Sequence, residues 1–340
     1  MKHINIPIFI PHLGCPNQCV FCNQRSISGV SSFDPANVTK IIDEALTTIP
    51  VGSDVEIAFF GGSFTGIDRT LMMDLLSMAY RYVERGAVSH IRCSTRPDYI
   101  DEDVLEILRR YGVRVIELGL QSTSENVLMA TKRGHDFSSE VRACQMIVDG
   151  GFDLVGQMMI GLPQSTLEDE LETARFIIGS GAVGARIYPT VVFNETELCQ
   201  LARDGKYTPL ELDEAVLRSA SVLKLFLDAG IEVIRIGLCA SENLSSVNTY
   251  FAGPNHAAIG ELVENRIYYE NITEKIKNKH LDAGDVLKIY VKKGCLSKAI
   301  GQKKKNKFLL TKALNTENIV FCENDDIAPY EASVVVERKR

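Results

Sequence analysis

The chain has 340 residues, of which 45% are hydrophobic and 24% charged, and its formal net charge is 37 − 44 = −7. These values indicate a folded, soluble chain with one large core and a smaller second part, and the acidic balance argues against a protein that coats nucleic acid along its whole surface. The sequence contains no run of about 18 uncharged apolar residues, and Pro7 and Pro11 interrupt the start, where a signal peptide needs an unbroken apolar stretch. We therefore expect a cytoplasmic protein with no membrane partner.

Short apolar, β-branched segments alternate with amphipathic helical segments along the first 240 residues. Runs of this kind are typical of buried parallel strands. Up to seven strand–helix repeats, joined by right-handed crossovers, predict an α/β fold with a partial (β/α)6-type parallel barrel over residues 1–245. The predicted strands are INIPIFI (4–10), VEIAFF (55–60), IRCST (91–95), RVIEL (114–118), DLVGQMMI (153–160), ARIYPT (185–190) and IEVIRI (231–236).

The segments with the most informative residues come directly after the predicted strands. Because parallel strands end at one edge of a sheet, we expect these loops to meet at that edge and to form the functional site there. In chain order the loops are the cysteine loop (14–22), GGSFTG (61–66), STRPDY (94–99), GLQS (119–122) and GLPQST (161–166).

The cysteine loop has the sequence GCPNQCVFC, which places Cys15, Cys19 and Cys22 in a C-x3-C-x2-C spacing. A disulfide framework disagrees with the odd total of nine cysteines, with the lack of paired spacing among the six outside this loop, and with a reducing compartment. A structural zinc with His12 as its fourth ligand is an alternative, but zinc sites usually consist of two separated ligand pairs. An iron–sulfur cluster fits better, since cubane clusters take thiolate ligands, and three thiolates leave one iron open to a small molecule.

This spacing, with Phe21 before the last cysteine, resembles the radical SAM superfamily. The resemblance implies that Cys15, Cys19 and Cys22 hold a four-iron four-sulfur cluster whose fourth iron binds S-adenosylmethionine. One electron from the reduced cluster would then cleave the sulfonium and release a deoxyadenosyl radical. The resemblance also implies that Gly61 and Gly62 receive the methionine amino group, although a Gly-Gly pair alone could equally be an ordinary tight turn.

The segments 94–100, 116–135, 156–166 and 186–207 resemble the radical SAM half of the Elongator catalytic-subunit family, which modifies the wobble uridine of tRNA. This resemblance implies that their polar side chains line the cofactor and substrate cavity. Taken singly, each of these residues could instead be structural. The residues expected to be catalytic are Lys132, Arg133, His135 and Tyr188, and those expected to bind the cofactor are Gly61, Gly62, Ser63, Ser94, Gln121, Ser122, Gln157 and Arg186.

The sequence also departs from that family. The family's first two cysteines are further apart, a long segment precedes them, and an acetyltransferase domain follows the barrel. None of the last 100 residues resembles such a domain, and RIGLCASENLSS (235–246) replaces the family's basic segment after the final strand. The sequence therefore leaves open both the use of acetyl-CoA and the identity of the product.

The C-terminal part is basic, because residues 286–312 contain nine lysines and no acidic residue. Residues 246–284 are expected to form a linker and a helix that closes the barrel. Residues 285–340 are expected to form a small α/β module of strand, helix, loop (GQKK, 301–304), helix and strand. This order resembles a KH-type RNA-binding module, with Lys304 in place of the second glycine of the G-x-x-G loop. The predicted phosphate contacts are Lys303, Lys304, Lys305 and Lys307, and the alternative is a small cap with a solvated lysine face.

Three functions from different classes follow from these features. The first is a radical SAM enzyme that acts on RNA, in particular tRNA, and takes its electron from a flavodoxin or ferredoxin. The second is a radical SAM oxidoreductase that acts on a small molecule such as a porphyrin. The third is a noncatalytic, metal-stabilised RNA-binding protein.

Overall fold

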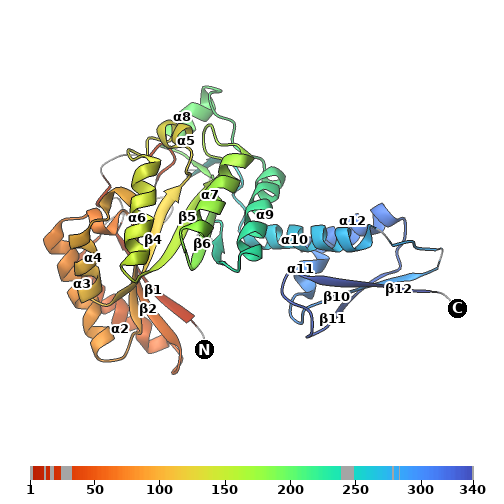
Figure 1. Ribbon diagram of the computed structural model, residues 1–340, viewed down its shortest axis with the longest axis horizontal. Coiled ribbons are helices and arrows are strands. Elements are labelled where there is room, and N and C mark those ends of the chain that lie inside the picture. The colour runs from red at the N-terminus through yellow and green to blue at the C-terminus, as the bar shows by residue number, and fades with distance from the viewer. Residues whose placement is uncertain are drawn as a thin grey trace. The chain divides into compact units, whose positions relative to one another are not determined.

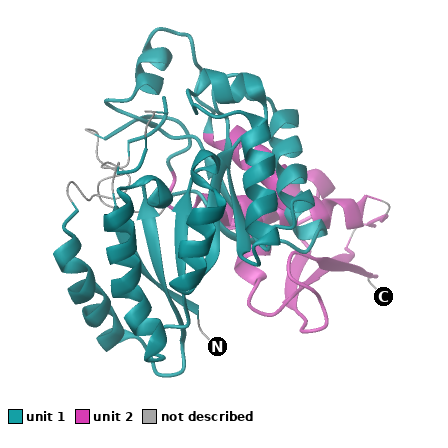
Figure 2. Ribbon diagram, turned by 60° about the vertical axis from the view of Figure 1, so that its left-hand side comes forward, with its two compact units in different colours: residues 1–211, 225–255 teal, residues 212–224, 256–340 magenta. Residues whose placement is uncertain are grey.

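The computed structural model describes residues 3–10, 13–15, 19–23, 33–238, 249–277, 279–282 and 284–338. The chain divides into two compact units, coloured separately in Figure 2. Unit 1 contains residues 1–211 and 225–255, and unit 2 contains residues 212–224 and 256–340. His12 and the segment 239–248 lie outside the described residues, so the zinc alternative and the replaced segment after the last strand stay predictions there.

Unit 1 is built on a seven-stranded parallel sheet in the order β1-β2-β3-β4-β5-β6-β8. The sheet curls into a partial barrel with helices on its outer face, which confirms the predicted fold (Figure 1). Its strands are β1 (His3–Ile10), β2 (Asp54–Gly61), β3 (His90–Thr95), β4 (Val113–Gln121), β5 (Asp153–Ile160), β6 (Gly184–Pro189) and β8 (Glu232–Ile236). The helices between them in the chain are α2 (Val38–Thr48), α3 (Arg69–Glu84), α4 (Glu102–Arg110), α5 (Glu125–Ala130), α6 (Phe137–Asp149), α7 (Leu167–Gly179), α8 (Glu197–Arg203) and α9 (Leu212–Asp228). Residues 212–224 of α9 belong to unit 2.

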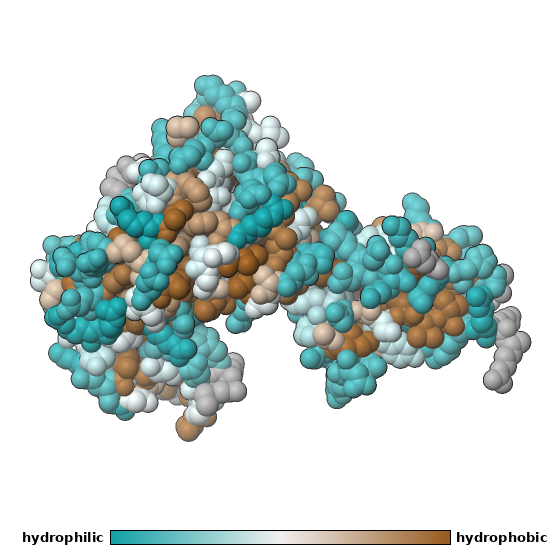
Figure 3. Space-filling view, in the orientation of Figure 1, coloured by the Kyte–Doolittle hydropathy of each residue, from teal (hydrophilic) through white to brown (hydrophobic). Residues whose placement is uncertain are grey.

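The outer face of the sheet is apolar, because alternate strand residues point toward the helices. Ile57, Phe59, Ile91, Ile116 and Leu118 lie on this face and are fully buried. On the outer surface of the helices hydrophilic residues predominate, and apolar residues show between them (Figure 3). The opposite, inner face of the sheet is where the charged strand residues lie.

A short antiparallel pair of strands in unit 1 was not predicted from the sequence. β7 (Val192–Phe193) pairs antiparallel with β9 (Tyr250–Ala252). Segments of two and three residues are too short to show a period of two, so periodicity gives no signal for them.

Unit 2 contains a three-stranded sheet in the order β11-β10-β12. β10 (Val286–Val291) runs parallel to β11 (Ile319–Glu323) and antiparallel to β12 (Ala332–Glu337). The predicted order of strand, helix, loop, helix and strand is present, with α11 (Leu296–Ile300) and α12 (Lys305–Leu314) between β10 and β11. The third strand, β12, was not predicted.

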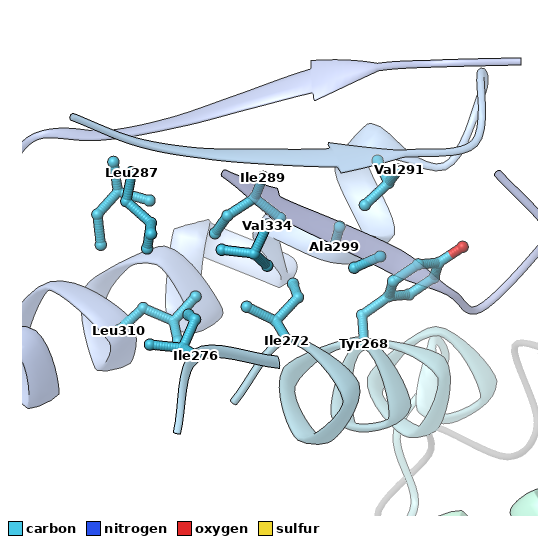
Figure 4. Close-up of a cluster of buried hydrophobic side chains, with 11 residues drawn as sticks. Tyr268, Ile272, Ile276, Leu287, Ile289, Val291, Ala299, Leu310 and Val334 are labelled. Carbon is cyan, nitrogen blue, oxygen red and sulfur yellow. The ribbon is translucent and has the colours of Figure 1, made fainter. Parts of the chain in front are cut away.

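Helix α10 (Ile259–Ile276) lies within residues 246–284, where a linker and a helix that closes the barrel were expected. The helix belongs to unit 2, where Tyr268, Ile272 and Ile276 pack against the sheet residues Leu287 and Ile289 (Figure 4). The hydroxyl of Tyr268 also accepts a hydrogen bond of 2.9 Å from the backbone N–H of Tyr330. The helix is therefore part of the core of unit 2.

The loop at 301–304 has an unusual backbone. Gly301 has φ +82°, and both Lys303 (φ +52°) and Lys304 (φ +62°) adopt left-handed conformations that L residues rarely take. Asn306 holds the loop, because its buried Nδ2 donates to the carbonyls of Asn265 (2.7 Å) and Ala299 (3.1 Å). At Lys304, a lysine therefore takes the conformation that a glycine adopts without strain.

The substitution Lys304→Gly should stabilise the protein by about 1 kcal/mol, because it removes a left-handed non-glycine residue outside α12. The matched control Lys307→Gly should instead destabilise it by about 1 kcal/mol, since Lys307 lies inside α12. Urea denaturation of both variants measures the two changes. Destabilisation in both variants would contradict the assigned strain.

Candidate active site

Five loops were expected to meet at one edge of the sheet, and direct hydrogen bonds join those after β1, β2 and β3 there. The N–H of Gly62, after β2, donates to the carbonyl of Ile10 at the end of β1 (2.9 Å). Ser63 and Thr95 join the loops after β2 and β3 through their hydroxyls (2.8 Å). The fifth loop, after β5, is tied to α7 instead, where the N–H of Gly161 donates to Glu170 (2.6 Å).

Three glycines allow the cysteine loop to lie directly on the turn after β2. A Cβ atom on Gly62 would overlap the carbonyl oxygen of Leu13, and one on Gly14 would overlap the carbonyl oxygen of Ser63. A Cβ on Gly66 would likewise overlap the carbonyl oxygen of Gly14. The two backbones are therefore too close for any side chain at these positions. The Gly-Gly turn has a packing role that its sequence did not reveal.

Val20, between the second and third cysteines, anchors the loop from the other side. Its N–H donates to the carbonyl of Thr131 (3.2 Å), and its carbonyl accepts from the N–H of Leu198 in α8 (2.8 Å). Its buried side chain packs with Val192 and Leu198. The cysteine loop is thus held between the turn after α5 and the N-terminal end of α8.

Two guanidinium groups approach the sulfur of Cys19, which is buried. Nη1 of Arg133 donates to Sγ at 3.3 Å, and Nη1 of Arg96 lies 3.8 Å from the same atom. Cys15 and Cys22 are half-buried. Burial raises the pKa of the Cys15 thiol, while a backbone hydrogen bond from Ser63 and the charge of Arg96 act in the opposite direction.

The residues present fit an iron–sulfur cluster with a polar ligand beside it. Three thiols lie in one loop, and two cations face one of them, which favours an anionic thiolate centre. Among the described residues, no group of three or more His, Cys, Asp or Glu side chains is arranged to hold a metal ion, and this includes the three cysteines. Two buried polar atoms, Nε of Arg133 and Oε1 of Gln121, have no hydrogen-bond partner among the described residues. Both side chains lie beside Gly119, near the end of β4. A polar ligand bound there would be able to form hydrogen bonds with these two atoms.

A row of buried charges crosses the inner face of the sheet. Oε1 of Glu117 accepts from Nη1 of Arg92 (2.8 Å) and from Nη2 of Arg186 (2.8 Å). Arg92 also pairs with Glu56, with Nε and Oε1 2.7 Å apart. The row continues to Tyr188, whose hydroxyl lies 3.4 Å from Nη1 of Arg186. Charge alternates along the row, so each buried ion has an opposite partner.

The sequence analysis identified Arg186 and Tyr188 in this row and missed Glu56, Arg92 and Glu117. A signal was available, since Glu56 is the only charged residue of the predicted strand VEIAFF (55–60) and Arg92 the only one of IRCST (91–95), while Glu117 shares RVIEL (114–118) with one other charged residue, Arg114. A charge in a fully buried strand must have a partner, and adjacent parallel strands are the nearest place for one.

His135 lies in a buried network, with its side chain 1% exposed. Its Nε2 lies 3.0 Å from Glu140 of α6, and its Nδ1 faces Asp98 of the loop after β3 at 3.6 Å. Burial raises the pKa of Glu140 to about 7, against the hydrogen bond and charge of His135. Burial also acts to raise the pKa of Asp98, but His135 and Arg96 hold it below its ordinary value. These contacts connect α6 to the loop after β3, and the catalytic role of His135 stays a prediction.

Lys132 is 59% exposed and forms an ion pair with Glu197 of α8 (2.6 Å). The pair links the turn after α5 to the helix that also contacts Val20. Lys132 adopts a left-handed backbone with φ +54°. Its predicted catalytic role stays a prediction, since the observed contact is structural.

The remaining predicted cofactor residues line the loop ends or the inner face. Ser94 donates to Oε2 of Glu117 (3.2 Å), and Gln157 is half-buried between Gly119 and Arg186 in the strand register. Ser122 is buried and accepts from the N–H of Ser124 (3.2 Å). Gly61 has φ +117°. Burial raises the pKa of Tyr188 above its ordinary value, and the charge of Arg186 acts in the opposite direction.

Comparison with known families decides the class of protein. The profile of the radical SAM superfamily matches residues 9–177, and the profile named Radical_SAM C-terminal domain matches residues 182–269. The chain belongs to the radical SAM superfamily. Radical SAM proteins are enzymes that use a four-iron four-sulfur cluster and S-adenosylmethionine. The predicted superfamily, enzyme class and cofactors are thereby confirmed.

Curated relatives of this radical SAM protein include tRNA-modifying proteins. The tRNA uridine(34) acetyltransferase of Methanocaldococcus infernus is 25% identical over 287 residues, covering 78% of this chain and 52% of that protein. Human Elongator complex protein 3 is 34% identical over 148 residues, covering 41% of this chain and 27% of that protein. Protein YhcC of Escherichia coli K12 is 25% identical over 225 residues, covering 62% and 71%. The chain thus spans about half the length of the archaeal relative.

A solved structure of M. infernus Elp3 with an N-terminal deletion (1–46) has the same fold. The TM-score is 0.63 at 20% identity, and the match covers 82% of this chain and 64% of that one.

The described residues contain no helix with the length and hydrophobicity that a membrane span requires.

The free energy of unfolding of the Glu140→Gln variant of this radical SAM protein should increase, relative to that of the unsubstituted chain, as pH rises from 4.5 to about 7. A carboxyl whose folded pKa lies near 7 binds more protons in the folded state, so its contribution to stability falls as pH rises through this window. Gln does not titrate and still offers an oxygen to His135. Urea denaturation at several pH values should show a relative gain of up to about 3 kcal/mol.

The control for this experiment is Asp136→Asn. Hydrogen bonds from Ser139 lower the pKa of Asp136 to about 2, so its contribution is lost only below the window and its effect should be nearly constant from pH 4.5 to 7. A flat profile for Glu140→Gln would contradict the raised pKa.

Proposed function

We propose that this radical SAM enzyme modifies RNA, in particular tRNA, and that Cys15, Cys19 and Cys22 hold its cluster. The observation that carries the cluster assignment is the position of the cysteine loop. The loop lies on the turn after β2 and is anchored through Val20, and two guanidinium groups face the sulfur of Cys19. An electron donor of the flavodoxin or ferredoxin class would reduce the cluster.

When bound, the cluster supplies one electron to the sulfonium of S-adenosylmethionine, which cleaves to release a deoxyadenosyl radical. The chain's own residues would hold and orient the cofactor. Gln121 and Arg133 offer unpartnered polar atoms at the end of β4, where a charged or amide-like group of the cofactor would find hydrogen bonds. Gly61 and Gly62 offer backbone in the adjacent turn.

The buried row of charges would keep the inner face rigid beside the cofactor. Glu117 fixes both arginines, and Arg186 in turn approaches the Tyr188 hydroxyl, so this phenol has a defined position. Tyr188, predicted as catalytic, would contact substrate from the inner face, and Gln157, predicted to bind the cofactor, would contact S-adenosylmethionine there. A rigid polar wall favours one substrate orientation, because it costs no reorganisation when the substrate binds.

Two lines of support favour RNA over a small molecule. The curated relatives that match most of this chain or its middle part include a tRNA uridine(34) acetyltransferase and Elongator complex proteins. Unit 2 adds a lysine-rich loop in which Lys303 and Lys304 have left-handed backbones. Strained residues that the surrounding structure holds in place are frequent at ligand-binding segments.

The four predicted phosphate contacts are not equivalent. Lys305 forms an ion pair with Asp213 in the same unit (3.1 Å), so part of its charge is already neutralised. No ion pair of Lys303, Lys304 or Lys307 is observed among the residues that the structure describes. We therefore assign the phosphate contacts mainly to these three lysines.

An exposed aromatic residue that the sequence analysis missed lies beside the lysines. Phe308 is 65% exposed, and it lies one helical turn after Lys304 in α12 and next to Lys307. Single-stranded RNA is bound by stacking of bases on aromatic rings and by basic contacts to its phosphates. Phe308 is the described residue best placed to stack a base beside these lysines.

Reductive cleavage of S-adenosylmethionine tests the cluster assignment. After anaerobic reconstitution the protein should be brown, and with dithionite it should release deoxyadenosine from S-adenosylmethionine. Replacing Cys19 by Ala should abolish release, while replacing Cys322 by Ala should not, since Cys322 lies in unit 2. Chromatography of the products gives the result, and a Cys19→Ala variant with normal turnover would refute the assignment.

Binding of bulk tRNA across a salt series tests the RNA substrate. Replacing Lys303, Lys304 and Lys307 together by Ala should weaken binding and flatten the salt dependence, by roughly one unit of slope for each phosphate that is no longer neutralised. The control Lys305→Ala should have a smaller effect, because Asp213 already pairs with this lysine. Absence of binding at low salt, or indifference to the three lysines, would favour a small-molecule substrate instead.

Phe308→Ala separates stacking from charge in the same assay. This variant should lose about 1 kcal/mol or more of binding free energy with an unchanged salt slope, because stacking involves no phosphate. A changed slope or an unchanged affinity would remove Phe308 from the RNA surface.

A further inference from the structure

Arg96 is a buried cation beside a predicted cluster ligand, and no role in the proposed reaction accounts for it. The residue follows β3 directly, and its side chain is 5% exposed. Its Nη1 lies 3.8 Å from Sγ of Cys19, at the long end of the range for a hydrogen bond to sulfur. At this distance and burial, the main effect of Arg96 on the sulfur is electrostatic.

Two carboxylate contacts and a backbone contact fix the position of this guanidinium. Nε and Nη2 of Arg96 donate to the two carboxylate oxygens of Asp98, at 2.9 and 3.0 Å. This bidentate pair defines the plane of the guanidinium. Nη2 also donates to the carbonyl of Arg133, whose own side chain donates to Cys19. Arg96 therefore acts on Cys19 through its own charge and by holding the residue that binds the sulfur.

The charge of Arg96 has a definite consequence for a cluster at this site. Adding one electron makes the cluster more negative by one unit, so a fixed positive charge beside a ligand sulfur stabilises the reduced form. The surrounding protein screens this charge less than water would. Asp98 acts with the opposite sign, because its carboxylate offsets part of the charge of Arg96.

We propose that Arg96 is a positioning residue that raises the reduction potential of the cluster through Cys19, and that Asp98 limits this effect. The proposal rests on the cluster assignment made under the proposed function. It adds a specific claim, that an Arg-Asp pair in the loop after β3 sets how readily the cluster accepts its electron. Hydrogen bonds and charges around cluster sulfurs are known determinants of reduction potential.

The test is the midpoint potential of the anaerobically reconstituted full-length protein. The cluster would be titrated with dithionite and followed by electron paramagnetic resonance, after iron per chain has been measured. Arg96→Gln should shift the potential to more negative values, because a positive charge is removed. Asp98→Asn should shift it to more positive values, because a negative charge is removed while the shape of the side chain is kept. Arg96→Lys should stay close to the unsubstituted protein.

Opposite shifts separate the proposal from a purely structural role, in which loss of either partner would disorder the same loop and change the potential in the same direction. Equal-sign shifts, or an unchanged potential in Arg96→Gln with full iron content, would overturn it. If Arg96→Gln fails to retain iron, Asp98→Asn decides alone, and an unchanged or more negative potential in that variant would overturn the proposal. An unsubstituted protein that takes up no iron would instead refute the cluster assignment on which the proposal rests.

Discussion

The candidate site depends on one backbone contact, between the cysteine loop and the turn after β2. At Gly14, Gly62 and Gly66 the two segments approach so closely that no Cβ atom fits between them. The contact fixes where the loop leaves β1 before the first cysteine. Val20 then fixes the loop a second time, between the turn after α5 and the N-terminal end of α8. These backbone contacts fix the position of the loop, and the side chains around the site then interact with a loop that is already in place.

The inner face of the sheet imposes a second constraint. Glu56, Arg92, Glu117 and Arg186 are buried there in alternating order, so strands β2, β3, β4 and β6 must keep a register that pairs them. Removing one member would leave an uncompensated buried charge, which costs several kcal/mol. Apolar residues of the same volume on this face would make the protein at least as stable. Stability therefore does not explain the buried charges, and we assign them to the chemistry of the site. A polar wall suits a charged cofactor that must be oriented on it.

Most of the barrel could be predicted from the sequence, because each strand is a compact apolar run and each functional loop follows one. The cysteine spacing likewise predicted an iron–sulfur cluster as the cofactor. The apolar residues of helix α10 show that it is buried, but they do not show which sheet buries it; Ile272 and Ile276 pack in unit 2. Arg96 was not named as a site residue, although its loop, STRPDY (94–99), was expected at the functional site. Its partner Cys19 is 77 residues away, and no local pattern reports such a contact.

Gly62 is required for the position of the cysteine loop, and the iron content of a variant with a side chain at this position tests that requirement. Gly62 has no positive φ, so Gly62→Ala adds a methyl group without a backbone penalty and places it against the carbonyl of Leu13. The control is Gly179→Ala, at an exposed position with open space around the new atom. After anaerobic reconstitution, and before S-adenosylmethionine is added, Gly62→Ala should hold much less iron per chain than Gly179→Ala. Equal iron in the two variants, with only cofactor binding impaired in Gly62→Ala, would contradict the account and assign this glycine to the cofactor alone.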